Sequence, residues 1–222
     1  MTAPSSHATP PDPGKRIHAL MTELYPICRS ITGPGVTQTL QRLQQEFPLV
    51  IREVASGTQV LDWTVPREWT ITDGWIKNEA GEKVVDFKKH NLHVVNYSSP
   101  VDTVLPLEEL RENLFSLPAK PTAIPYRTSY YDDSWGFCIS DEDLSALPEG
   151  NYHAFIDSKL EPGFLRYGEY VIPGRSDQEI LITTHVCHPS MANDNLSGIG
   201  IATLLASALT GTTPYFTHRF LF

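Results

Sequence analysis

The sequence predicts an α/β fold interrupted by a mostly β segment, and two observations carry this prediction. Both ends of the 222-residue chain alternate helix-like and strand-like apolar patterns, whereas the middle is rich in strand-forming and aromatic residues. A β-rich domain inserted into an α/β parent explains the change of composition at both boundaries. We expect a disordered tail over residues 1–14, the parent domain over 15–56 and 164–222, and the inserted domain over 57–163.

The N-terminal part predicts two amphipathic helices and a strand. Apolar side chains recur at helical spacing over residues 17–28 and again over 36–47, and the helix-ending segment 30–35 separates them. Pro48 ends the second pattern, and residues 49–54 have the composition of a strand. Two helices leading into a strand are typical of the opening of an α/β domain.

The middle of the chain predicts strands joined by turns, with two short helices. A hairpin is expected where residues 70–77 and 83–87 flank a polar turn. Ser140 begins a capping-box pattern that predicts the start of a helix. Further strands are expected over 92–97, 152–157 and 165–172, and a further helix over 108–117.

The C-terminal part predicts a strand, a loop, a buried helix and a second strand. Residues 179–184 have the continuous apolar centre of a buried strand, and 196–209 are apolar nearly all round. With the strand-like run 215–222 they form a βαβ unit. Because that run reaches Phe222 with no polar residue after it, we expect the chain to be truncated.

Composition and charge exclude several classes of protein. With 41% hydrophobic and 19% charged residues, the chain is globular and is neither collagen, coiled coil nor wholly disordered. The 26 acidic against 17 basic residues give a net charge of −9, which excludes nucleic acid and anionic membranes as expected partners. Three scattered cysteines without a CxxC pair, together with the absence of a signal-peptide pattern, predict a cytoplasmic protein with reduced thiols.

The loop after residues 179–184 gathers the side chains that carry chemistry. His185, Cys187, His188 and Asp194 lie within ten residues, at the carboxyl end of a predicted strand, where α/β proteins place their sites. Imidazole nitrogen and carboxylate oxygen bind zinc, so His185 and Asp194 are the candidate metal ligands. Taken singly, His185 is better explained as a structural histidine and Asp194 as a helix N-cap, and only their joint spacing favours a metal.

These residues carry a resemblance to a known family. His185 followed by Ala192–Gly198 (A-N-D-N-L-S-G) is similar to the H-x-D … D-D-N-x-S-G signature of the two-zinc aminopeptidases, which include bacterial leucyl aminopeptidases and glutamate carboxypeptidases. The resemblance implies that His185 binds one metal and Asp194 bridges two zinc ions. It also implies a three-layer zinc-exopeptidase-type (phosphorylase/hydrolase-like) α/β domain, incomplete in this chain and interrupted by the mostly β inserted domain.

A narrower resemblance covers most of the chain. The segments 24–33, 56–63 and 126–131 are similar to those of uncharacterised bacterial aminopeptidase-like proteins that carry an inserted domain of unknown function. Those proteins are roughly twice this long, in line with a catalytic domain, an insert and a further module. The resemblance implies that the general-base Glu, a further acidic ligand and the last His lie beyond Phe222.

The main departure from the family signature is Cys187, which stands where the family has an Asp that orients a metal ligand. Cys187 and His188 are therefore candidates for a supporting role behind the ligands. The alternatives are that Cys187 is a buried, unreactive thiol and that His188 itself binds a metal. If the strand continues past His185, alternation places His188 on the face opposite Cys187.

A group of aromatic and basic side chains in the middle segment is the candidate substrate-binding surface. Packing within a β-rich core is the alternative explanation for these residues. They are Tyr126, Arg127, Tyr130, Tyr131 and Trp135.

The resemblance implies an aminopeptidase-like zinc metallohydrolase that cleaves a peptide or related amide through a metal-activated water. A small peptide or amide is then the expected partner. Because the general base is expected beyond Phe222, this chain alone is expected to be inactive. The alternative is a non-catalytic binding or scaffold protein that keeps the hydrolase fold and is linked to polysaccharide or secondary-metabolite biosynthesis.

Overall fold

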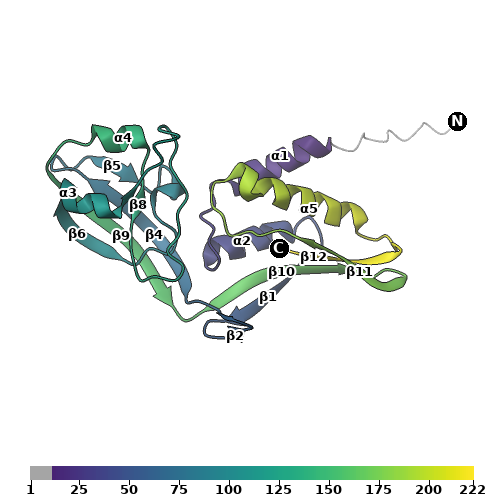
Figure 1. The fold of residues 1–222 in the computed structure, drawn as a ribbon. Coiled ribbons are helices and arrows are strands. Elements are labelled where there is room, and N and C mark those ends of the chain that lie inside the picture. Colours follow the sequence, from purple (N-terminus) through teal and green to yellow (C-terminus); the bar gives the residue numbers. More distant parts are fainter. Residues whose placement is uncertain (1–11) are drawn as a thin grey trace.

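Two four-stranded sheets, each with its own hydrophobic cluster, make up the structure of residues 12–222, a computed structural model (Figure 1). The first sheet has the strand order β1-β10-β12-β11 and lies with three helices. The second has the order β5-β4-β9-β6. The mixed α/β fold expected from the sequence is confirmed.

The first part of the fold, which we call the α/β part, combines both ends of the described chain. Its helices are α1 (Pro13–Leu24), α2 (Pro34–Leu43) and α5 (Ser197–Leu209). Its strands are β1 (Val50–Ala55), β10 (Phe164–Ile172), β11 (Ser176–Thr183) and β12 (Phe216–Leu221).

The second part, which we call the β-rich part, lies between them in sequence. Its sheet contains β4 (Glu68–Lys77), β5 (Lys83–Asp86), β6 (Val101–Pro106) and β9 (Asn151–Glu161). The short pairs β2 (Gln59–Val60) with β3 (Trp63–Thr64), and β7 (Leu114–Phe115) with β8 (Phe137–Cys138), accompany it. Its helices are α3 (Leu107–Leu110), α4 (Asp141–Ala146) and the 3₁₀ turns Asn91–His93 and Arg111–Asn113.

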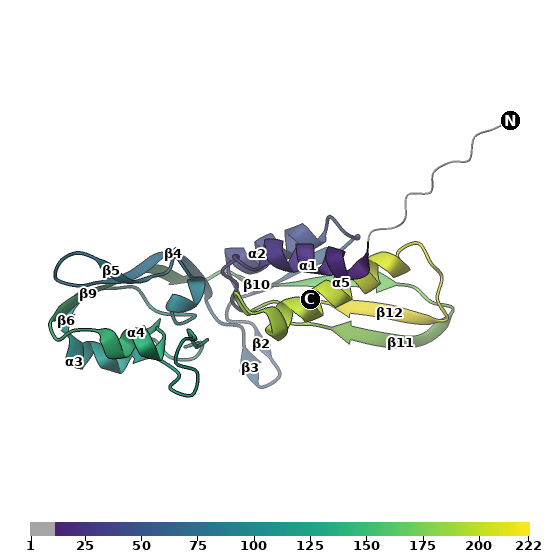
Figure 2. The same ribbon diagram turned by 90° about the horizontal axis from the view of Figure 1, so that it is seen from above.

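Helices cover one face of the first sheet, as Figures 1 and 2 show. Leu40 of α2, Ala206 of α5 and Phe220 of β12 are fully buried in the shared cluster. On the open face, ion pairs join all four strands, because Glu169 of β10 binds both Arg52 and Arg219, and Arg219 binds Glu179. Residues 12–222 therefore form two layers here, and the expected third layer is not among them.

The predicted βαβ unit is confirmed, since β11 and β12 pair in parallel and α5 connects them. The prediction that its first strand is buried is wrong. Strand β11 lies at the edge of the sheet, and none of its residues is fully buried; the Leu181 side chain is 58% exposed. An apolar sequence shows that a strand can be covered, but not that a neighbour covers it.

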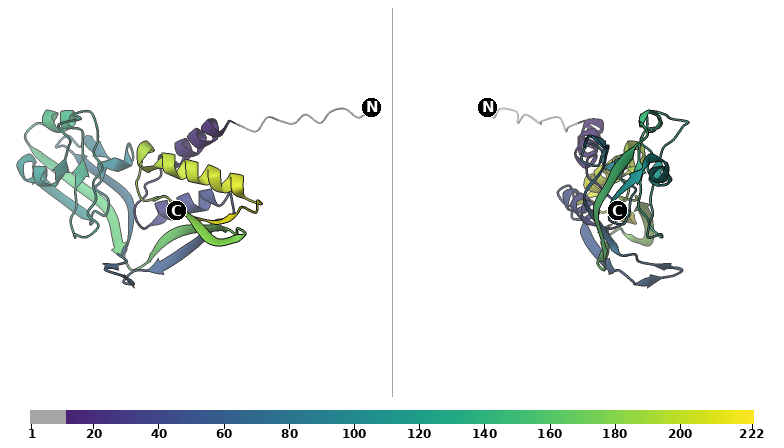
Figure 3. Two further views of the ribbon diagram at one scale, coloured as in Figure 1. Left: turned by 45° about the vertical axis from the view of Figure 1, so that its right-hand side comes forward. Right: turned by 90° about the vertical axis from the view of Figure 1, so that its left-hand side faces the viewer.

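The chain leaves and re-enters the α/β part at adjacent points (Figure 3). The Ser56 amide donates to the Gly163 carbonyl at 2.9 Å, and the Gly163 amide donates to the Ser56 hydroxyl at 3.0 Å. Beside this crossing, Arg166 pairs with Glu68 at 3.0 Å. Strands β9 and β10 are thus neighbours in sequence that belong to different sheets.

Several element predictions hold and others need correction. The hairpin of β4 and β5 and the Ser140 cap, whose hydroxyl accepts from the Asp143 amide at 3.1 Å, are confirmed. The first helix ends at Leu24 rather than 28, because Pro26 cannot continue it. The predicted helix over 108–117 is shorter, since residues 114–115 pair as strand β7.

The predicted strand over 92–97 is wrong. His90 Nδ1 accepts from the Leu92 amide and starts a 3₁₀ turn there, and only Val94 and Asn96 make isolated bridges. The predicted tail, residues 1–14, lies mostly outside the described residues, but Pro13 and Gly14 belong to α1. Across residues 12–222, no helix combines the length and hydropathy needed to cross a bilayer.

His93 makes the β-rich part sensitive to acid. Its Nδ1 lies 2.8 Å from the Cys138 carbonyl, and burial lowers the pKa of His93 below its ordinary value of 6.5. The imidazole of His93 therefore binds a proton more readily in the unfolded chain than in the folded one. The stability that neutral His93 contributes above pH 6.5 is lost as the pH falls through the pKa of His93 in the folded protein. His93→Asn keeps a donor near Cys138 and is expected to flatten the fall in unfolding free energy between about pH 7 and about pH 5.

Urea unfolding at a series of pH values measures this effect. His18→Asn, at an exposed histidine of α1, is the matched control for replacing an imidazole by an amide. An equally steep fall in His93→Asn would contradict the assignment.

Candidate metal centre

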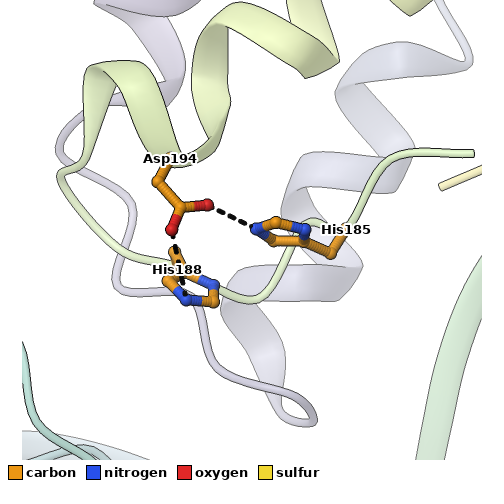
Figure 4. Close-up of side chains that lie close together, drawn as sticks. All are labelled: His185, His188 and Asp194. Carbon is orange, nitrogen blue, oxygen red and sulfur yellow. Dashed lines mark hydrogen bonds and ion pairs between the residues drawn. The ribbon is translucent and has the colours of Figure 1, made fainter.

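Three side chains of types that can bind a metal converge where β11 ends (Figure 4). His185 Nε2 lies 2.7 Å from Asp194 Oδ1, and His188 Nε2 lies 4.0 Å from Asp194 Oδ2. One nitrogen or oxygen from each residue lies within 4.8 Å of the others. The carboxylate therefore faces one imidazole with each of its oxygens.

The loop and the start of α5 are held together by Asn195. Its amide nitrogen donates to the Thr184 hydroxyl at 2.6 Å and to the His185 carbonyl at 2.8 Å. Asp194 and Asn195 have non-helical backbone angles just before α5, which turns the Asp194 side chain toward the loop. Gly198 is required here, because a Cβ at this position would lie 2.0 Å from Asn195 Oδ1.

His188 is fixed from both parts of the fold. The fully buried Arg29 guanidinium donates to the His188 carbonyl through Nε at 3.1 Å and Nη2 at 2.9 Å, and to the Leu24 carbonyl at 2.6 Å. Tyr126, from the β-rich part, packs on the imidazole with ring centroids 4.8 Å apart. The backbone and the ring of His188 are therefore both constrained.

Burial sets the protonation of the two neighbouring side chains Cys187 and His188. It lowers the pKa of His188, with a smaller opposing effect of Asp194, so the imidazole is neutral at neutral pH. Burial likewise raises the pKa of Cys187, so its thiol stays protonated and is a poor nucleophile or metal ligand.

Cys187 Sγ lies 3.0 Å from His188 Nδ1. When Nδ1 carries the imidazole hydrogen and donates it to sulfur, Nε2 is left with its lone pair on the side of Asp194. This tautomer is the one that a ligand through Nε2 needs. The alternation expected for His188 does not apply, because the strand ends at Thr183.

The candidate substrate-binding residues do not gather at one place. Tyr126 packs on His188, and its hydroxyl lies 2.8 Å from that of Tyr130. Tyr130 and Tyr131 line a small pocket of the β-rich part. Arg127 lies over the Phe115 ring at 4.2 Å, and Trp135 packs against the hydrophobic cluster of the β-rich part.

Arg29 and Asn195 hold the candidate site together by hydrogen bonds, and the sequence alone assigned them no role. Asn195 stands beside Asp194 in a polar loop, so its spacing is a usable signal. Arg29 lies 159 residues from His188, and nothing local predicts their contact.

An open groove of about 580 Å³ runs from the metal-binding cluster along α5. His185 and Asp194 form one end, and apolar side chains of β11 and α5 form its walls. Ile201 and Leu205 on α5 are 59% and 41% exposed, so this wall offers apolar contact beside the cluster.

The donor set fits zinc. Two imidazoles and one carboxylate are ligands of catalytic zinc sites, whereas calcium and magnesium prefer oxygen donors. His185 and Asp194 are exposed, so a substrate can reach the cluster from solvent.

Structural comparison defines the fold class. A zinc aminopeptidase from Bacillus subtilis matches with a TM-score of 0.59 and 12% identity, over 94% of this chain and 60% of that chain. At this identity the likeness shows a common fold. The chain thus has an aminopeptidase-like fold.

Sequence comparison defines the family. Residues 18–222 match the family described as a domain of unknown function, DUF4910, and the chain belongs to that family. The Clostridium acetobutylicum "Putative polysaccharide biosynthesis protein with aminopeptidase-like domain" is 50% identical over 209 residues, 94% of this chain and 48% of that protein. A crystal structure of a "putative peptidase" from the same organism has a TM-score of 0.92 at 50% identity, over 95% of this chain and 50% of that chain.

The chain therefore spans about half the length of these relatives. The expected relationship to aminopeptidase-like proteins is confirmed, and the domain of unknown function matches residues 18–222 rather than the expected insert over 57–163 alone.

The contact between Gly198 and Asn195 can be tested by a double-mutant cycle. Gly198→Ala is expected to displace the Asn195 amide, break its two hydrogen bonds and lower the unfolding free energy by about 2 kcal/mol. In the Asn195→Ala background, the same substitution should be neutral or stabilising, because the clash is gone and Ala favours the helix. Equal destabilisation in both backgrounds, measured by urea unfolding, would contradict this account.

Proposed function

We propose that the chain carries the metal-binding part of an aminopeptidase-like zinc hydrolase. The convergence of His185, His188 and Asp194 on one point is the observation that supports this most directly. The aminopeptidase-like fold and the family membership agree with it. What we propose beyond this fold and family is that the chain binds zinc and takes part in hydrolysis.

Each residue has a role in this proposal. His185 and His188 would hold zinc by their imidazoles and Asp194 by its carboxylate, which the family resemblance implies is shared by two ions in a complete site. When bound, zinc supplies a Lewis acid that polarises a carbonyl and lowers the pKa of a coordinated water. Arg29 and Tyr126 keep His188 in place, and Asn195 keeps the His185 backbone against the start of α5.

The groove beside the cluster is the proposed place for a small peptide or related amide. Its apolar wall of Ile201 and Leu205 suits an apolar side chain next to the reacting bond. Among residues 12–222, the cluster brings together no glutamate that could act as general base. We propose that hydrolysis needs groups from outside this chain, as the family signature implies.

We also propose that the β-rich part is an insertion into the α/β part, over residues 57–163. The reciprocal hydrogen bonds of Ser56 and Gly163 support it, because they join the two crossing points. We further propose that the complete protein has the third layer expected of a zinc-exopeptidase-type domain.

A second candidate function is a non-catalytic binding or scaffold protein. The relative named for polysaccharide biosynthesis favours it. In this case the cytoplasmic protein would keep the fold without turning over an amide.

Zinc binding tests the first proposal. We expect the chain to bind zinc in calorimetric titrations, and His185→Ala, His188→Ala and Asp194→Ala each to lower the affinity at least about tenfold, because each removes one ligand. His153→Ala is the matched control, since His153 forms an exposed pair with Asp102 at 2.5 Å but has no third ligand. A wild type that binds no zinc would favour the scaffold alternative.

Cys187 provides a separate test of how His188 is oriented. Cys187→Ala removes the acceptor of the Nδ1 hydrogen and is expected to weaken zinc binding about tenfold, whereas Cys187→Ser retains an acceptor and most of the affinity. The buried Cys138→Ala serves as a control for the loss of a thiol elsewhere. If Cys187→Ser and Cys187→Ala bind zinc equally, the orienting role is wrong.

A further inference from the structure

We propose that the pocket between Arg67 and residues 129–133 binds a single sugar ring, either neutral or bearing an amino group. The pocket has a volume of about 190 Å³ and lies in the β-rich part. It is distinct from the metal-binding cluster, and its function does not depend on zinc.

The walls of the pocket are held from several directions. The Tyr97 hydroxyl donates to the Arg67 carbonyl at 3.1 Å, and the Ser129 amide donates to the Asn96 carbonyl at 2.8 Å. Tyr97 and Tyr130 pack edge to face with centroids 5.1 Å apart. These contacts fix the base of the pocket and leave its rim to solvent.

The rim presents an aromatic ring without a covering neighbour. Tyr131 is 77% exposed and meets Tyr130 edge to face at 6.3 Å. A ligand that covers this exposed aromatic ring would remove apolar surface from water, which favours binding. The C–H face of a pyranose is apolar and flat enough to pack on this ring.

Polar groups beside the ring match hydroxyl chemistry. Arg67 supplies only donors, and Asp132 and Asp133 supply only acceptors, whereas each sugar hydroxyl both donates and accepts. Arg67 and Asp133 already face each other at 2.6 Å, so a guanidinium and a carboxylate are presented together to neighbouring hydroxyls. A purely apolar ligand would make no hydrogen bonds to the donor and acceptor positions that these groups have left over.

Charge and size narrow the ligand class. Two carboxylates against one guanidinium make the rim net negative, which disfavours phosphates and acidic sugars and favours a neutral or amino sugar. The volume limits the occupant to about one ring. Tyr130 also contacts Tyr126, which packs on His188, so a bound sugar would lie one pair of tyrosines from the metal-binding cluster.

Saturation-transfer NMR on the full chain tests the proposal, with a chelator present so that metal plays no part. The probes are D-glucose, D-galactose, D-glucosamine, D-glucuronate and the dipeptide alanyl-alanine. We expect saturation of glucosamine and of at least one neutral hexose with a Kd on the order of 1 mM, and weaker saturation of glucuronate.

Variants locate the binding. Tyr131→Ala and Arg67→Gln are expected to weaken sugar binding about tenfold, while Tyr131→Phe keeps the ring and most of the affinity. Tyr215→Ala is the matched control, because Tyr215 is another exposed tyrosine, 60% accessible, in the α/β part. Saturation of none of the neutral and amino sugars, equal binding of glucuronate, preferential saturation of the dipeptide, or sugar binding unchanged in Tyr131→Ala overturns the proposal.

Discussion

The loop that carries the candidate metal ligands depends on one buried cation, Arg29. Arg29 is fully buried, and within residues 12–222 no carboxylate pairs with it. Its guanidinium is satisfied instead by the carbonyls of Leu24 and His188, so it ties the end of α1 to the loop that follows β11. Burial lowers the pKa of Arg29 to about 10, which leaves it charged at neutral pH. Loss of the Arg29 side chain would release the backbone at His188 and thereby disturb the geometry of the cluster.

Contacts that lie close in the sequence were the ones that sequence reasoning could predict. The Ser140 cap, the β4–β5 hairpin and the order of β11, α5 and β12 all follow from patterns within a few residues. His185 and Asp194 also belong to a single loop. The contact of Arg29 with His188 and the exposure of β11 depend on which distant segments meet, and composition alone does not record that.

The proposed site is assembled from both parts of the fold. The α/β part contributes the three candidate ligands, and Tyr126 of the β-rich part packs on His188. Burial raises the pKa of Tyr126 to about 12, so this side chain adds no charge beside the ligands at neutral pH. The interface is further tied by Thr32, whose hydroxyl lies 2.5 Å from that of Tyr97 and accepts from the Trp69 amide. A neutral aromatic wall of this kind shapes the surroundings of an ion without competing for it.

The adjacency of Ser56 and Gly163 makes the β-rich part a cassette. Both of its ends meet at one hydrogen-bonded point, so if it is an insertion, as proposed above, its gain or loss would leave the strand order β1-β10-β12-β11 unchanged. Because the β-rich part brings Tyr126 onto His188, a change of this part would alter the surroundings of the imidazole while the three candidate ligands themselves stayed the same.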